Sequence, residues 1–174
     1  VGGPAKMSVV ASGLFGSISG SSVANTVSTG AFTIPMMKKA GFKAEEAAGI
    51  EAAASTGGQF LPPVMGAGAF LLAVFSDTSY IQVAAMNVIP AILYFYWVGW
   101  VIHHRASRFN IRGKVEEGTP TTMEVMKEGW YFFVPLVLIV GILFAGYTPA
   151  YAGFYGIVAT VVLSWINPKN RVTP

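Results

Sequence analysis

Cysteine is absent from the 174-residue sequence, and charged residues are scarce. Without a thiol the chain can form no disulfide, no cysteine nucleophile and no cysteine-ligated metal site. Charged residues make up 11% of the chain, whereas a soluble domain carries about 25%. Together with 53% hydrophobic residues and a mean hydropathy of +0.58, this shortage of charge predicts an all-α polytopic membrane protein.

The usual sequence signals of enzymes are also missing. The two histidines, His103 and His104, are adjacent and so do not face each other on a helix; we expect them at the membrane interface. The run Gly16–Gly20 has Ile18 at its centre, where a nucleophile elbow needs serine. No Lys-Ser or Lys-Thr pair follows it, as a phosphate-binding P-loop requires. We therefore expect no enzymatic activity, no organic cofactor and no nucleic-acid partner.

A stretch rich in serine and glycine, Gly16–Asn25, separates two apolar arms at residues 5–17 and 23–37. Each arm has about 15 residues and would be roughly 22 Å long as a helix, which is too short for the ~30 Å hydrocarbon core of a bilayer. The lysines of this region lie at the outer ends of the arms. The pattern predicts a re-entrant helical hairpin over residues 1–42, whose tip exposes free backbone groups at membrane depth.

A second interrupted element is expected at residues 43–79. Its first turn carries two carboxylates, which suits the start of a helix. The stretch 56–63 then brings two glycines and a Pro-Pro pair, which a continuous helix does not tolerate. We expect one discontinuous transmembrane helix that is broken at 56–63; a plain proline kink is the alternative.

Three further transmembrane helices follow from the remaining apolar runs. Residues 80–104 predict one spanning helix, residues 105–129 a basic cytoplasmic linker with a surface helix, and residues 130–168 two spanning helices. If both ends of the hairpin lie on one side, all eleven lysines and arginines fall on that side. The positive-inside rule assigns it to the cytoplasm. An ordinary spanning helix at the start would break this agreement, so the charges favour the re-entrant hairpin.

Candidate site residues gather at the two breaks. Serine hydroxyls and freed carbonyls are hard oxygen ligands suited to Na⁺, and the second arm directs the positive end of its dipole toward an anion. Transporter sites often form where interrupted helices meet near the membrane midplane. The residues concerned are Ser19, Gly20, Ser21, Ser22 and Asn25 at the tip and Thr56, Gly57, Gly58, Gln59 and Pro62 at the break. The alternative is that small residues at both places only allow helices to pack closely.

Glu51 stands apart, because it is an acid about two turns into the discontinuous helix. An intramembrane acid is a functional candidate by default. The alternative is a position near the interface, in a hydrated crevice. The sequence does not choose between the two.

The motifs at both breaks resemble those of a known family. Gly16–Asn25, with Gly30, Pro35–Met37 and Gly41-Phe42, resembles the first hairpin of the large membrane subunit of tripartite ATP-independent periplasmic (TRAP) transporters. Glu51–Gln59, with Pro62–Ala67, looks most like the fused-permease branch that works with TAXI-type binding proteins. The resemblance is specific through about residue 75 and rests on apolar helices beyond it.

The resemblance implies an elevator-type secondary transporter in the bacterial inner membrane. It would couple Na⁺ entry to uptake of an organic acid that a periplasmic binding protein delivers. In such transporters the hairpin tips and broken helices hold Na⁺ and substrate, which on this chain points to Ser19, Ser21, Ser22 and Asn25, with Thr56, Gly57 and Gly58. Of these, Ser19, Ser21, Ser22 and Thr56 are the expected Na⁺ ligands. The family has two inverted repeats and this chain shows one, so the remainder of the same permease is an expected partner, together with the lipid bilayer.

Two other functions fit the same features. A re-entrant loop with exposed carbonyls can form the selectivity filter of an ion channel. A non-transporting membrane scaffold would use the Ser/Gly tip only for packing. The substrate, the choice between Na⁺ and H⁺, and the oligomeric state do not follow from the sequence.

Overall fold

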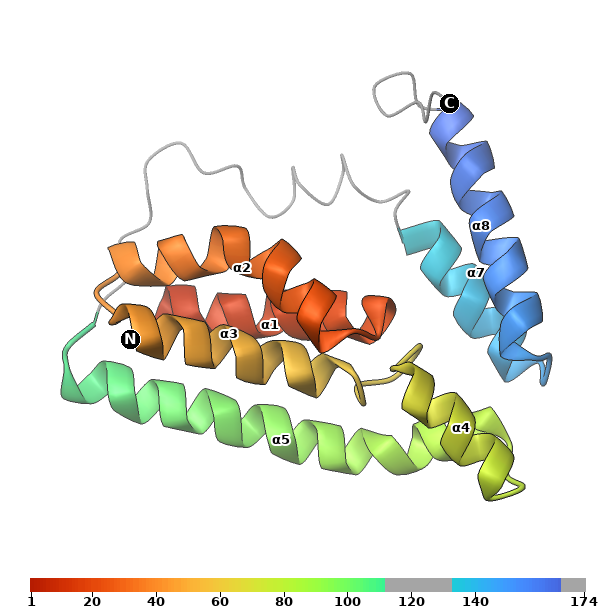
Figure 1. Ribbon diagram of the computed structural model, residues 1–174, viewed down its shortest axis with the longest axis horizontal. Helices are drawn as coiled ribbons and strands as arrows, with labels where there is room; N and C mark the ends of the chain where they lie inside the picture. The colour runs from red at the N-terminus through yellow and green to blue at the C-terminus, as the bar shows by residue number, and fades with distance from the viewer. Residues whose placement is uncertain (112–132, 167–174) are drawn as a thin grey trace. The chain divides into compact units, whose positions relative to one another are not determined.

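A computed structural model describes residues 1–111 and 133–166, and every regular element in these ranges is an α-helix. The chain divides into two compact units, Val1–Val115 and Glu116–Pro174, which are described separately. Of the described helices, five lie in the first unit and two in the second (Figure 1). Most of the basic linker and surface helix expected at 105–129 lies outside the described residues.

Helices α1 (Gly3–Ser19) and α2 (Ser22–Lys39) form a hairpin with a two-residue link. Gly20 has a φ of 65°, a left-handed conformation that glycine adopts without steric cost, and it ends α1. Ser21 caps α2, because its hydroxyl accepts a hydrogen bond from the Ala24 N–H at 3.3 Å. The Gly-Ser pair thus ends one helix and starts the next.

Helices α3 (Ala44–Gly58) and α4 (Ala67–Phe75) are separated by the irregular segment 59–66. The break begins three residues later than the expected 56–63. Glycine costs about 1 kcal/mol inside a helix, whereas proline removes an N–H donor and clashes with the preceding turn. The helix therefore continues through Gly57 and Gly58 and stops before the two prolines.

Helix α5 (Tyr80–Arg108) begins with a reciprocal cap and is the longest described element. The Ser79 hydroxyl accepts from the Gln82 N–H at 3.3 Å, and the Gln82 side chain accepts from the Ser79 N–H at 3.1 Å. Among the described helices, α5 alone is both long and apolar enough to cross a membrane by itself. It continues four residues beyond the expected end at position 104.

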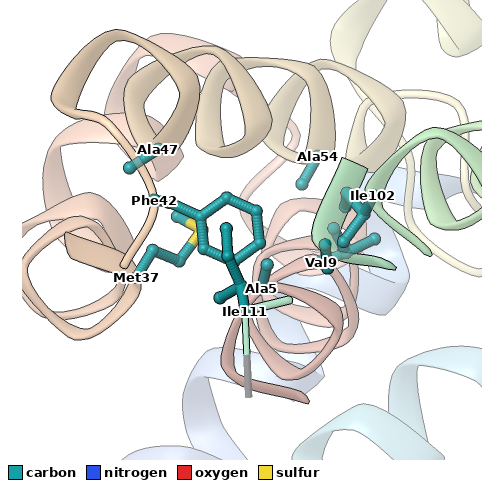
Figure 2. Packing of buried hydrophobic residues seen from close by; sticks show 9 residues of the cluster. Ala5, Val9, Met37, Phe42, Ala47, Ala54, Ile102 and Ile111 are labelled. Atoms are coloured by element: carbon teal, nitrogen blue, oxygen red, sulfur yellow. The ribbon is translucent and has the colours of Figure 1, made fainter. Parts of the chain in front are cut away.

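The apolar core of the first unit lies where the outer end of the hairpin meets α3 and α5 (Figure 2). Its members are mostly small or medium side chains, which let the helices approach closely. The Gly2 N–H donates to the Ile111 carbonyl at 3.1 Å, so the start of the chain is tied to the end of α5. The core consists of Ala5, Val9, Met37, Phe42, Ala47, Ala54, Ile102, Ala106 and Ile111.

Charged side chains join the helices at this same end. The Lys6 ammonium donates to His103 Nδ1 at 3.1 Å, which links α1 to α5. The Arg105 guanidinium donates through Nε to Glu46 Oε1 at 2.6 Å, which links α5 to α3. The basic ends of separate helices are therefore brought together, on the side of the unit from which the hairpin starts and to which it returns.

The second unit is a pair of apolar helices, α7 (Phe133–Phe144) and α8 (Pro149–Ile166). The chain turns between them at Gly146, which has a φ of 84°. Gly156 lies directly against the Ile139 side chain, and a Cβ at position 156 would come within 2.6 Å of it. Close packing of this kind is common between membrane helices.

Candidate functional site at the hairpin tip and the helix break

The hairpin tip consists of the end of α1, the two-residue link and the start of α2. The Gly20 N–H donates to the Gly16 carbonyl at 2.9 Å, which completes the last turn of α1. The Ser19 side chain is exposed, and Ser21 and Ser22 are partly exposed. Serine hydroxyl groups are therefore available at the tip.

The break between α3 and α4 folds back on itself. The Gly66 N–H donates to the Gln59 carbonyl at 2.6 Å, which closes the segment into a loop. The Pro62–Pro63 peptide bond is cis, and Met65 has a φ of 57°. Gln59 and Pro62, two of the predicted site residues, are both half-buried in this loop.

The tip and the break are in direct contact. The Met65 N–H donates to the Ser17 carbonyl at 3.0 Å, which links the end of α1 to the loop. A Cβ at Gly20 would lie 2.6 Å from the Met65 carbonyl oxygen, and a Cβ at Gly66 would lie 2.8 Å from the Gly20 oxygen. The two backbones touch at Gly20 and Gly66, where only glycine leaves enough space.

Gly57 and Gly58 lie in α3 and serve close packing in this structure. A Cβ at Gly58 would lie 2.5 Å from the Gly16 Cα, so α1 and α3 cross at these two glycines. A Cβ at Gly57 would lie 2.6 Å from the Tyr94 ring. Helix packing alone explains why both positions lack a side chain.

Thr56 is not gathered with the serines of the tip. Its side chain is exposed, and its hydroxyl donates to the Ala52 carbonyl of its own helix at 2.8 Å. In the part of the chain that the structure describes, no hydrogen bond joins Thr56 to Ser19, Ser21 or Ser22. The Thr56 hydroxyl is thus engaged by its own helix, and the assignment of these four residues as Na⁺ ligands stays a prediction.

Asn25 lies fully buried beneath the tip. Its Nδ2 donates to the Ser12 carbonyl at 2.8 Å, and its Oδ1 lies 3.3 Å from the Thr29 hydroxyl. The side chain thus holds the two arms of the hairpin together. In this structure these contacts position the tip, and a binding role for Asn25 stays a prediction.

A cluster of hydroxyl groups surrounds the carboxyl group of Glu51, which is 0% exposed. Its Oε1 accepts from the Thr29 hydroxyl at 2.5 Å, from the Ser12 hydroxyl at 2.6 Å and from the Ser55 hydroxyl at 3.2 Å. Its Oε2 accepts from the Thr33 hydroxyl at 2.6 Å. We call these five residues the Glu51 cluster. It connects α1, α2 and α3.

The Glu51 cluster was not predicted as a unit from the sequence, although the spacing of its polar residues indicates shared helix faces. Asn25, Thr29 and Thr33 recur every four residues on α2, and Glu51 and Ser55 are four apart on α3. Residues four apart share one face of a helix, and polar residues on one face of an apolar helix need polar partners. Full burial also rules out the hydrated crevice considered for Glu51.

A family model and several known proteins match nearly the whole chain. The family model described as "Tripartite ATP-independent periplasmic transporter, DctM component" matches residues 1–173. A putative TRAP transporter large permease protein of Haemophilus influenzae is 26% identical over 154 residues, which cover 87% of this chain. No solved structure matches.

Two further relatives carry substrate names. The C4-dicarboxylate TRAP transporter large permease protein DctM of Vibrio cholerae is 31% identical over 155 residues, or 87% of this chain. The 2,3-diketo-L-gulonate TRAP transporter large permease protein YiaN of Escherichia coli is 28% identical over 167 residues, or 92% of this chain. These matches cover 38%, 33% and 39% of the three relatives in turn, so the chain spans well under half of their length.

Proposed function

The chain belongs to the DctM-component family of TRAP transporter large permeases, and from this premise we propose that the complete protein is a Na⁺-coupled secondary transporter. It imports an organic acid that a periplasmic binding protein delivers. Two relatives support this substrate class: one is named for C4-dicarboxylates and another for 2,3-diketo-L-gulonate, a sugar acid.

The contact between two interrupted elements is the observation that carries this proposal. The Met65 N–H donates to the Ser17 carbonyl at 3.0 Å, so the hairpin tip lies against the helix break. Discontinuous helices that meet in this way provide helix ends and free carbonyls for substrates and ions. A continuous packed bundle would offer neither.

The exposed end of the tip is the proposed binding surface. Ser19, Ser21 and Ser22 would supply hydroxyl oxygens to Na⁺, while the start of α2 favours a carboxylate through its dipole. Backbone carbonyls of the break between Gln59 and Gly66 would complete the ion ligands in place of the Thr56 hydroxyl. The second repeat of the complete permease would close the site from the other side.

The placement in the membrane is part of the same proposal. We propose that α1 and α2 enter and leave the inner membrane on its cytoplasmic side, because both arms carry their lysines at the outer end. Helix α5 would span the bilayer, and its aromatic residues near Trp97 and Trp100 would lie at the interface.

The TAXI-associated branch is the finer assignment that we propose within the family. It is supported by the motifs Glu51–Gln59 and Pro62–Ala67, which supply the buried acid of the Glu51 cluster and the break. A complete gene that encodes the small membrane subunit in the same chain, beside a gene for a TAXI-type binding protein, would agree with this assignment. Separate small and large subunits would contradict it.

The test is uptake by the full-length permease in proteoliposomes together with its binding protein. Radiolabelled succinate, a C4-dicarboxylate, and 2,3-diketo-L-gulonate are the probes, with and without an inward Na⁺ gradient. We expect saturable uptake that requires both the binding protein and Na⁺. Flux without the binding protein that does not saturate would instead indicate a channel, and a protein that mediates no flux would fit a scaffold.

The double variant Ser19→Ala, Ser22→Ala tests the binding surface without removing the Ser21 cap of α2. We expect Na⁺-dependent uptake to fall about tenfold or more, because each lost ligand to a charged group is worth about 1.5–3 kcal/mol. Ser76→Ala, in the exposed turn after α4, is the matched control. Unchanged uptake and Na⁺ dependence in the double variant would reject this site.

A further inference from the structure

The Glu51 cluster has no part in the function proposed above, yet it holds a carboxyl group that is entirely buried. Its partners are Ser12 from α1, Thr29 and Thr33 from α2, and Ser55 from α3. All four are neutral hydroxyls. Among the described residues, no basic side chain forms an ion pair with Glu51.

The charged groups of the neighbouring helices lie instead toward the basic end of the unit. On α1 and α5, Lys6 is bonded to His103; on α3 and α5, Glu46 is bonded to Arg105. On α5, the Tyr80 hydroxyl donates to the Pro63 and Val64 carbonyls and the Tyr94 hydroxyl donates to the Ala53 carbonyl. The other acidic and basic groups on α2, α3 and α5 are exposed. They are Lys38, Lys39, Glu45, His104 and Arg108.

A buried carboxylate without a counter-charge is costly. Transfer of an ion from water to a medium of low dielectric constant costs several kcal/mol even after relaxation. A bound cation or a proton on the carboxyl group itself would remove this cost.

The distances within the cluster favour the proton. The oxygen atoms of Glu51, Ser12 and Thr29 approach one another to 2.5–3.1 Å, which are hydrogen-bond distances. A coordinated metal ion lies about 2.0–2.6 Å from each oxygen ligand, so an ion among these atoms would have to push them apart. A hydrogen atom fits between them as they stand.

The number of hydroxyl hydrogens in the cluster also favours a proton on Glu51. The Thr29 hydroxyl lies 2.5 Å from Glu51 Oε1 and also 2.8 Å from the Asn25 carbonyl, but it has one hydrogen to donate. Thr33 has the same choice between Glu51 Oε2 at 2.6 Å and the Thr29 carbonyl at 3.0 Å. A proton on Glu51 lets one of these hydroxyls accept from the carboxyl group while it donates to the main chain.

We propose that the Glu51 cluster is a proton-binding site. Glu51 carries a proton while the hairpin is packed on α3, and it exchanges that proton with water when the two separate. Its hydroxyl partners come from both arms of the hairpin, so water reaches the carboxyl group only after such a movement. The use of this proton as a coupling ion rests on the transport function proposed above, whereas its presence does not.

Infrared spectroscopy of the purified full-length permease tests the proton directly. A protonated carboxyl group has a C=O stretching band that a carboxylate lacks. We expect this band at neutral pH in the wild type and in Glu45→Gln, an exposed acid on the same helix, and its loss in Glu51→Gln. A band intensity that is the same in the wild type and in Glu51→Gln would overturn the proposal.

Glu51→Asp keeps the proposal testable if Glu51→Gln does not fold. It keeps a carboxyl group among the same hydroxyls, so we expect a C=O band that is shifted in frequency. A folded Glu51→Asp protein with only carboxylate absorption, together with a wild type that shows no band, would also overturn the proposal.

Transport assays then test the coupling. In proteoliposomes with equal Na⁺ on both sides, Glu51→Gln should retain exchange of labelled for unlabelled succinate. It should lose at least tenfold of the accumulation that an imposed pH gradient drives in the wild type. The coupling role would be rejected if accumulation in the wild type did not depend on the pH gradient and equalled that of Glu51→Gln. No uptake by the wild type with its binding protein would instead count against the proposed function, and the infrared result would stand.

Discussion

Two glycines, Gly16 and Gly58, set how closely α1 and α3 approach. The Cα of Gly16 would lie 2.5 Å from a Cβ placed at position 58. Backbone on the other side of a contact cannot move aside as the end of a flexible side chain can. The position of the hairpin on α3 therefore depends on the absence of single methyl groups.

We expect Gly58→Ala to destabilise the protein by about 1–3 kcal/mol, because it overpacks a backbone contact. Gly49→Ala on the same helix is the control: no atom lies within 4 Å of its Cβ, and removal of glycine from a helix should stabilise it by up to about 1 kcal/mol. Thermal unfolding of the full-length protein in detergent measures both. Equal unfolding temperatures for the two variants would contradict the packing.

A second residue-scale prediction concerns the Glu51 cluster. Thr33→Val removes a hydroxyl that bonds Glu51 Oε2 at 2.6 Å but keeps the shape of the side chain. It leaves a buried polar atom without a partner, which costs about 1–3 kcal/mol. Ser28→Ala, exposed on the same helix, should have little effect. Thermal unfolding compares the stability of the two variants. A Thr33→Val protein as stable as Ser28→Ala would count against a cluster in which every polar atom is hydrogen-bonded.

At the scale of the elements, the hairpin and the broken helix act through their contact. The link of two residues holds the ends of α1 and α2 together, and the loop between α3 and α4 receives them. Both are irregular backbone, which membrane proteins tolerate only where it is covered by protein or faces a water-filled cavity. Each break therefore partly covers the other.

Gly20→Ala tests this contact. Alanine is strained at a φ of 65°, and its Cβ would lie 2.6 Å from the Met65 carbonyl oxygen. We expect a loss of about 1–2 kcal/mol in stability and a marked loss of uptake, because the tip is displaced from the break. Gly68→Ala in α4, with open space around it, is the control. Normal uptake by Gly20→Ala would show that the contact is not needed for transport.

At the scale of the whole molecule, the distribution of charge predicts the orientation of the chain in the membrane. Lys6 and Arg105 lie at one end of the first unit, where α1, α3 and α5 are joined by polar contacts. The turn between α4 and α5 carries Asp77 and no basic residue. We expect the first group to lie in the cytoplasm, because the positive-inside rule assigns basic residues to that side.

The lack of cysteine makes this orientation directly measurable. Single substitutions Lys38→Cys and Asp77→Cys introduce the only thiols of this segment. In right-side-out and inside-out vesicles, a membrane-impermeant maleimide should label position 38 only from the cytoplasmic side and position 77 only from the opposite side. Labelling of both positions from one side would refute the proposed orientation of α3–α5.

Sequence patterns alone were enough to predict the structural elements that depend on local chemistry. Proline and glycine interrupt helices because of their own backbone restrictions, so the two breaks could be located to within a few residues. The apolar run of α5 and its polar cap at Ser79 are equally local. The family resemblance depended on the same residues, and the match over residues 1–173 confirms it at the level of the TRAP large permease.

Tertiary structure alone decided which neighbours the residues of the breaks contact. Gly57 and Gly58 were predicted as site residues, and the structure shows them as packing positions against Tyr94 and Gly16. Thr56 turns to its own helix because a threonine hydroxyl can bond the carbonyl four residues earlier. Such choices depend on which helix lies alongside.

Glu51 shows most clearly which features the sequence determines and which depend on tertiary structure. The sequence by itself determined that an acid stands within an apolar helix, since composition and periodicity are local properties. That its carboxyl group is enclosed by hydroxyls from Ser12, Thr29 and Thr33 was decided only by the packing of α1 and α2 on α3. These partners are 39, 22 and 18 residues away in the chain, and no local pattern specifies which distant residues a folded chain brings together.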